Sequence, residues 1–327
     1  MAGDLLALPK ANLHLHLTGS MRPTTAAELA ARYGLAGLPA VPIEDGVVHT
    51  WAAFQARYDV ARSAVRSVAD IARVVREAVE QDAADGAGWT ELQIDPTAYS
   101  EHLGGLEAVV DAALDSAAGL PLGVVLAAAW GSPPAHADRI AAIAVRRAPD
   151  GVVGFGLSGD ERRGTTADYV PAFRRVRDAG LAAVPHAGFY HGAWHVREVV
   201  ELLGATRVGH GLTALEDPAV VDLLAERGVT LEVCPTSYPP FGGPAPGELP
   251  LRALADAGVP VALATDDPLL FRTGLVGQYA LVREYLELSD AELARLATGS
   301  IRASCAPPAL RERALAGVRD WLDSTSR

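Results

Sequence analysis

Two kinds of hydrophobic pattern alternate along this chain. Short apolar runs, typical of buried β-strands, are separated by longer stretches in which apolar residues recur every three or four positions, as in amphipathic helices. The strand-like runs span residues 11–17, 89–95, 123–129, 152–157, 182–186, 207–209, 229–233 and 261–264, and helical periods are clear over 68–85 and 196–203. Eight strands that alternate with helices form a parallel sheet and favour its closure into a (β/α)8 barrel of the TIM type.

Strands that alternate with helices can also form an open, doubly wound sheet, which is the alternative. The dinucleotide-binding form of that sheet carries a GxGxxG sequence after its first strand, and no such sequence follows residue 17. The 327 residues exceed the ~150 of an average domain, but a barrel commonly uses about 250. We therefore predict one α/β barrel domain over 1–327, with a helical insertion over about 20–88 that covers the barrel mouth.

Composition excludes several classes of protein. Half of the residues are hydrophobic, and 28 basic against 40 acidic side chains give a net charge of −12. That balance disfavours a nucleic-acid partner, because phosphate contacts need basic surfaces. The longest apolar stretch, 122–130, is much shorter than the ~20 residues that span a bilayer, and the sequence opens without a signal-peptide pattern. Two cysteines make no disulfide framework, so we expect a cytoplasmic protein with neither a membrane nor a nucleic-acid partner.

Polar side chains that bind metals follow the predicted strands at their carboxyl ends. They are His14, His16, His186, His210, Asp266 and Asp267. Active sites in barrels lie at that face, so we expect these side chains to converge. His14 and His16 are two positions apart in one strand and share a face, where both imidazoles can bind one ion. A pair of core or solvated histidines is the alternative, but His186 and Asp266 at other strand ends favour a metal site.

Three imidazoles and one carboxylate with an open position are typical of a catalytic Zn2+, which lowers the pKa of bound water towards ~7. Such sites also accept Fe2+ or Mn2+. Because neighbouring side chains diverge, one of Asp266 and Asp267 can bind the metal while the other contacts substrate, although an Asp pair can instead cap the next helix. His210, between two glycines, is a candidate base; a plain loop histidine is the alternative.

Together these motifs resemble the adenosine deaminase family of the amidohydrolase superfamily. The matching segments are 8–10, 14–17, 159–161, 186–188, 209–211, 232–237 and 265–269. The resemblance implies a (β/α)8 barrel with one catalytic Zn2+. It also implies four metal ligands: His14, His16, His186 and Asp266.

The resemblance further implies roles around the metal. His210 would orient or deprotonate the water, and Asp267 would contact both the water and the substrate ring. Gly159 would offer its backbone to a purine nitrogen. Phe54 and Tyr58 fall where the family places apolar pocket residues on a lid helix. The implied partner is a small molecule, either a purine nucleoside or a related heterocycle.

Two departures from the family pattern change the expected chemistry. The family's His-Ala-Gly-Glu motif ends here in Phe189, which cannot donate a proton to the purine ring as the glutamate does. A general acid contributes about 10^2–10^4-fold in rate, or about 3–5 kcal/mol of barrier. The usual acidic residue that holds the ribose is Thr18. The ligand set persists while acid and sugar contacts change, which predicts a retained metal and an altered substrate.

His191 is a candidate replacement for the missing acid, because histidine titrates near physiological pH. It lies two residues beyond Phe189. Residues 189 and 191 face different directions at a helix start, so the alternative is that Phe189 lines an apolar pocket with no acid in its place.

Three functions follow from these observations. We predict a zinc-dependent hydrolase or deaminase that acts on a modified purine nucleoside or another nitrogen heterocycle. The first alternative keeps the metal but catalyses a hydration, dehydration, elimination or ring-opening step in specialised biosynthesis. The second is a catalytically inactive homologue that binds a nucleoside, and the intact ligand set argues against it.

Overall fold

The computed structural model describes residues 3–35, 42–44 and 46–325. Eight parallel strands form its sheet, and each strand pairs with the next along the chain. They are β1 (Lys10–His16), β2 (Ala87–Ile94), β3 (Leu122–Ala129), β4 (Val152–Ser158), β5 (Ala182–Ala187), β6 (Arg207–His210), β7 (Thr230–Val233) and β8 (Val261–Leu263). Each predicted strand lies within two residues of one of these strands, because strands buried on both faces form nearly continuous apolar runs.

A short parallel bridge between Leu15 and Asp266 closes the sheet. The backbone N–H of His16 donates to Asp266 O at 3.1 Å, and the N–H of Asp266 donates to His14 O at 2.8 Å. These bonds join β1 to the residues that follow β8. The nearly closed barrel confirms the predicted (β/α)8 fold and excludes the open doubly wound sheet.

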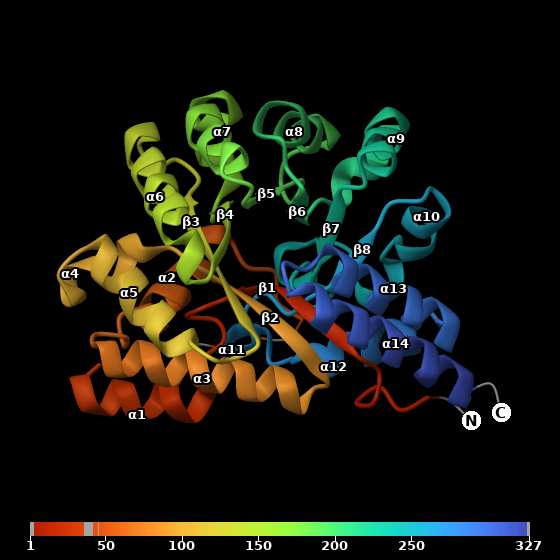
Figure 1. Cartoon of the computed structure of the whole chain (residues 1–327), viewed down its shortest axis with the longest axis horizontal. Coiled ribbons are helices and arrows are strands. Elements are labelled where there is room, and N and C mark those ends of the chain that lie inside the picture. Colours follow the sequence, from red (N-terminus) through yellow and green to blue (C-terminus); the bar gives the residue numbers. More distant parts are fainter. Residues whose placement is uncertain (1–2, 36–41, 45, 326–327) are drawn as a thin grey trace.

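Helices surround the strands (Figure 1). They are α1 (Pro23–Tyr33), α2 (Trp51–Arg62), α3 (Val68–Ala84), α4 (Ser100–Leu103), α5 (Leu106–Ala117), α6 (Pro134–Arg147), α7 (Val170–Asp178), α8 (Ala193–Glu198), α9 (Pro218–Arg227), α10 (Leu251–Asp256), α11 (Pro268–Phe271), α12 (Leu275–Tyr285), α13 (Asp290–Ala303) and α14 (Pro308–Thr325). Helix α14 contacts the segment before β1: Trp321 Nε1 donates to Asp4 O at 2.7 Å.

Capping residues explain where several of these helices begin. Ser67 accepts from the Asp70 N–H at the start of α3, and Asp217 accepts from the Ala219 N–H at the start of α9. Ser289 begins α13 with a full capping box. Each cap satisfies N–H groups that have no partner within the helix, so the local sequence fixes these boundaries.

The predicted helical insertion after β1 is present as α1, α2 and α3. Helix α3 packs on β2 and α5 and so serves as a helix of the barrel wall. Helix α2 reaches the barrel mouth, where Trp51, Phe54 and Tyr58 line the cavities described below. The assignment of 1–327 to one domain stays a prediction. Across the described residues, no helix has the length and apolar character needed to cross a membrane.

The helix predicted over 196–203 is present, but it is not a regular α-helix along its whole length. Helix α8 begins earlier, at Ala193, and at Val199 it passes into a π-helix, Val199–Leu203, that ends at Gly204. The wider π turn keeps Val199, Val200 and Leu203 buried together. Hydrophobic periodicity alone does not distinguish this turn from a continuous α-helix.

A chain of buried charges crosses the barrel interior. Arg207 Nε donates to Glu232 Oε1 at 2.6 Å, and Arg207 Nη2 forms a second ion pair with Glu91. All three side chains are at most 2% exposed. Burial alone would lower the pKa of Arg207, but the two carboxylates raise it above its ordinary value. Each charge is therefore held in a water-free interior by its partners.

We predict that Arg207→Met lowers the free energy of unfolding by about 3–5 kcal/mol, because it leaves two buried carboxylates without a cation. Urea denaturation followed by circular dichroism measures the loss. Arg175→Met is the control, since Arg175 pairs with Asp138 at the surface, and it should leave the stability unchanged. Equal stability of the two variants would contradict the prediction.

Candidate metal centre and active site

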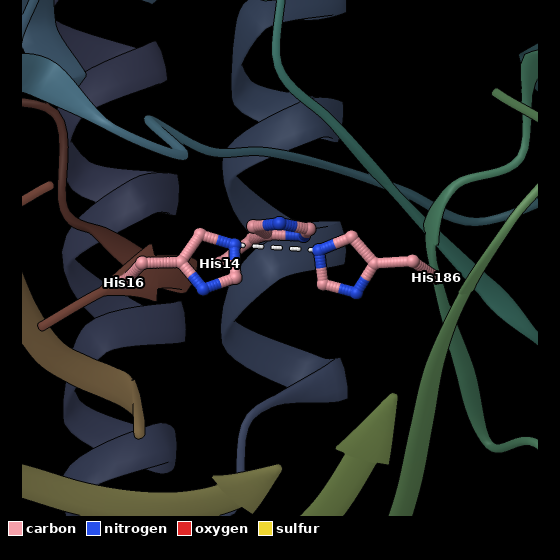
Figure 2. Close-up of side chains that lie close together, drawn as sticks. All are labelled: His14, His16 and His186. Atoms are coloured by element: carbon pink, nitrogen blue, oxygen red, sulfur yellow. Dashed lines mark hydrogen bonds between the residues drawn. The ribbon is translucent and has the colours of Figure 1, made fainter. Parts of the chain in front are cut away.

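Strands β1 and β5 bring three histidines together at the carboxyl end of the barrel. His16 and His186 point towards one another (Figure 2), and the His14 ring packs against both, with its centroid 5.1 Å from that of His16 and 4.4 Å from that of His186. The Nε2 atoms of His16 and His186 are 3.3 Å apart. One ligand nitrogen from each of the three rings lies within 4.8 Å of the others. The spacing of two residues in β1 therefore places both imidazoles on the inner face, as predicted.

Asp266 completes this cluster from the chain after β8. Its Oδ1 lies 3.2 Å from His16 Nε2 and 3.5 Å from His14 Nε2. The backbone of Asp266 has φ +59°, a left-handed conformation that is uncommon outside glycine. The two hydrogen bonds that close the barrel hold it there. The structure thus brings together the four predicted ligands.

The chemistry of these side chains fits a divalent metal ion. His14 Nε2 is buried and has no hydrogen-bond partner among the described residues. Burial and, for His186, the neighbouring imidazoles lower the pKa of His16 and His186, so both rings are neutral. Burial would raise the pKa of Asp266, but the two β1 imidazoles hold it well below its usual value. Neutral imidazoles and an ionised carboxylate are the forms that bind metals, so a bound ion would displace the proton that the raised pKa of His14 retains.

Glu232 of β7 orients His14. Its Oε2 lies 3.0 Å from His14 Nδ1, while its other oxygen accepts from Arg207. Burial alone would lower the pKa of His14, but the nearby carboxylates of Asp266 and Glu232 raise it to about 10. A carboxylate behind a ligating imidazole fixes its ring and increases its basicity. In the sequence, Glu232 stands out only as a member of the matching segment 232–237. The signal that could identify it as a functional residue is that it is a single carboxylate within an apolar strand.

Gly209 of β6 leaves room for two of the ligands. A Cβ atom at this position would lie 2.8 Å from His14 Cε1 and 3.1 Å from His186 Cγ. Any side chain would therefore displace the rings. The glycine before His210 has a steric role at the metal cluster.

His210 and Asp267 stand beside the ligands, as predicted. His210 Nε2 lies 4.0 Å from Asp266 Oδ2, and burial lowers the pKa of His210 to about 4, so its ring is neutral. Burial and the neighbouring Asp266 raise the pKa of Asp267 well above its usual value. Asp267 Oδ1 is buried without a hydrogen-bond partner in the described structure, and a Cβ at Gly19 would collide with it.

Two cavities open at this cluster. The smaller, of about 50 Å³, is bounded by the histidines and by the rings of Trp51, Phe54, Phe189, Tyr190, Phe241 and Phe271, with Gly159 and Glu161 at its edge. The larger, of about 300 Å³, shares His16 and Asp267 with it and is more polar, with Tyr58 and Tyr99 in its wall. Thr18 donates to or accepts from the Tyr99 hydroxyl at 2.6 Å. Of the predicted pocket residues, Phe54, Tyr58, Gly159 and Phe189 therefore line a cavity, and Thr18 lies behind one.

Phe189 covers the cluster with an aromatic ring. Its centroid is 4.7 Å from that of His210 and 5.3 Å from that of Phe241. The structure does not bring His191, the candidate replacement acid, to the cluster. The His191 ring packs 4.8 Å from Trp194 and 5.1 Å from His195, and it lines neither cavity.

Comparison with known proteins identifies the family. Residues 9–321 match the model of the adenosine deaminase family. The chain belongs to the adenosine deaminase family. A putative adenosine/adenine deaminase from Streptomyces virginiae is 46% identical over 335 residues, and the alignment covers 98% of each chain. This family member is therefore an adenosine/adenine deaminase-like hydrolase.

Solved structures of relatives share the barrel. Adenine deaminase from Arthrobacter aurescens superposes with a TM-score of 0.85 at 26% identity, covering 96% of this chain and 99% of that one. An amidohydrolase from Burkholderia ambifaria, solved with bound Zn, superposes with a TM-score of 0.87 at 24% identity, covering 98% and 93%. The fold of this chain is thus that of adenine deaminases and related amidohydrolases.

We predict that Glu232→Gln weakens metal binding by about 10–100-fold, because His14 loses the carboxylate that orients it. Competition with a chelator, read by elemental analysis, measures the affinity. Glu107→Gln is the matched control, since Glu107 is an exposed residue paired with Arg146. Unchanged metal affinity in Glu232→Gln would show that the barrel holds His14 without this contact.

Proposed function

We propose that this protein is a zinc-dependent hydrolase that deaminates a modified purine nucleoside or another nitrogen heterocycle. The observation that carries the proposal is the convergence of three imidazoles and Asp266 beside His210 and Asp267 in a member of the adenosine deaminase family. Zinc is favoured by this set of donors and by the Zn found in the related Burkholderia structure.

The metal would be held by His14, His16, His186 and Asp266, and it would lower the pKa of water at the site. The neutral His210 accepts the proton of the attacking water. Asp267, whose pKa is raised, keeps a proton and donates a hydrogen bond to the heterocycle. Gly159, with φ +82° at the cavity edge, presents its backbone to a ring nitrogen. The oxygen of water bonds to the ring carbon and the carbon–nitrogen bond to the amino group breaks. The proton taken up by His210 passes to the amino group, which leaves as ammonia.

Phe189 narrows the choice of substrate. It stands beside His210, where the family resemblance places a proton-donating glutamate, and it has no proton to give. Ring protonation is needed least when the attacked carbon is already electrophilic. We therefore propose a substrate more electrophilic than adenosine, with an apolar face towards the aromatic wall.

The same residue favours a second candidate reaction. A metal site without a ring-protonating carboxylate suits a hydration, dehydration, elimination or ring-opening step that releases no ammonia. The presence of all four ligand side chains opposes the third candidate, an inactive nucleoside-binding homologue.

The first test combines elemental analysis of the purified protein with an ammonia-release assay on adenosine, adenine and a panel of modified aminopurines. We expect about one zinc per chain and faster ammonia release from a modified aminopurine than from adenosine. Zinc without ammonia from any compound would favour the second reaction. Absence of metal would contradict the ligand assignment.

Phe189→Glu is expected to increase adenosine deamination by up to about 10^2–10^4-fold, because it supplies the missing general acid. The measurement is kcat/KM for adenosine, with zinc content checked in parallel. Phe189→Gln is the matched control: its amide has the same shape but no acidic proton, and it should give no gain. If the Glu variant also gains nothing while zinc stays bound, the pocket itself differs from that of an adenosine deaminase.

A further inference from the structure

One buried carboxylate near the metal cluster has no part in the mechanism above. Glu161 begins a short 3-10 turn, Glu161–Arg163, directly after β4, and it is 1% exposed. Among the described residues its only ion-pair partner is His195 of α8, with Oε2 3.6 Å from His195 Nδ1. Burial would raise the pKa of Glu161, but the nearby His195 ring and hydrogen bonds from backbone N–H groups lower it. The side chain is therefore a carboxylate and a poor proton donor.

The other oxygen of Glu161 binds the chain between β5 and α8. Oε1 accepts from the backbone N–H groups of Phe189 at 3.1 Å, Tyr190 at 2.6 Å and His191 at 2.6 Å. These N–H groups belong to neither a strand nor a helix, so no regular element satisfies them. A single carboxylate thus fixes three consecutive peptide groups.

The fixed segment follows the metal ligand His186 after a sharp turn. Gly188 has φ +70°, and a Cβ there would lie 2.6 Å from Val196 Cγ2 and 2.7 Å from Thr213 Oγ1. The chain turns at this glycine, and Glu161 then determines where the next residue points. That residue is Phe189, whose ring packs on His210.

We infer that Glu161 is a positioning residue that holds Phe189 over the metal cluster and so determines which heterocycles enter the small cavity. It acts through the backbone of 189–191 and does not itself transfer a proton. The effect on substrate choice rests on the proposed function, whereas the effect on the position of Phe189 does not.

Hydrogen exchange measures the backbone contacts directly. In Glu161→Ala, the amides of 189–191 should exchange at least tenfold faster than in the parent protein, read by mass spectrometry of a peptide spanning the segment. Glu161→Gln should retain protection, because its amide oxygen still accepts the three N–H groups and its NH2 group faces His195 Nδ1. Glu201→Ala, which removes an exposed carboxylate from the adjoining π-helix, is the control and should leave exchange unchanged.

The position of Phe189 is read from the ring protons of His210 by NMR. Phe189→Leu removes the ring-current shift that Phe189 causes, and we expect Glu161→Ala to move the same resonances in the same direction. Glu161→Gln should not move them. Unchanged protection and unchanged His210 resonances in Glu161→Ala would overturn the inference.

Turnover tests the consequence for substrate choice. The ratio of kcat/KM for N6-methyladenosine to that for adenosine should change at least fivefold in Glu161→Ala, mainly through KM, and should be retained in Glu161→Gln. Loss of activity in Glu161→Gln with normal exchange and resonances would show that Glu161 takes part in the reaction itself, which overturns the positioning role. If the parent protein turns over neither nucleoside, the deaminase proposal loses support, while the exchange and NMR results still decide whether Glu161 positions Phe189.

Discussion

The pair of backbone hydrogen bonds between β1 and Asp266 is the constraint on which the site depends. The peptide groups of Asp266 bond to His14 O and to the His16 N–H, so one contact closes the barrel and places a carboxylate beside two imidazoles. The left-handed backbone of Asp266 persists only because the surrounding structure holds it. Folding and metal binding are consequently linked: an ion that binds only the closed barrel stabilises it by mass action.

The barrel interior contains buried charged side chains, although such side chains are seldom fully buried unless they are paired. Glu232 binds His14 on one side and Arg207 on the other, and Arg207 also binds Glu91. Each group is costly to bury alone, and each is tolerable because its partner is present. Glu91 of β2 and Arg207 of β6 hold Glu232 in place, and Glu232 in turn holds the His14 ring on β1. The orientation of His14 therefore depends on residues far from it in sequence.

The sequence predicts the barrel and the ligands because both obey short-range rules. Alternation along β1 decides that His14 and His16 share a face, and parallel topology brings strand ends together. The remaining features depend on contacts between distant loops. Nothing in the local sequence shows that Glu161 binds the segment after β5, or that His191 turns towards Trp194 and away from the metal. Loops lack the hydrophobic periodicity from which strands and helices are predicted.

Phe189 combines a feature that the sequence shows with one that only the structure shows. Its identity is visible in the sequence, but its effect comes from where the loop places its ring, against His210 and within an aromatic wall. If the proposed deamination takes place there without a general acid, about 3–5 kcal/mol of barrier must be removed by other means. Under the proposed function there are two sources: a substrate carbon that is more electrophilic than that of adenosine, and a hydrogen bond to the substrate ring from Asp267, which lines the same cavity. Both act on the substrate ring, so the proposed deaminase needs no second acid: the cluster of His14, His16, His186 and Asp266 and the aromatic Phe189 are compatible within one site.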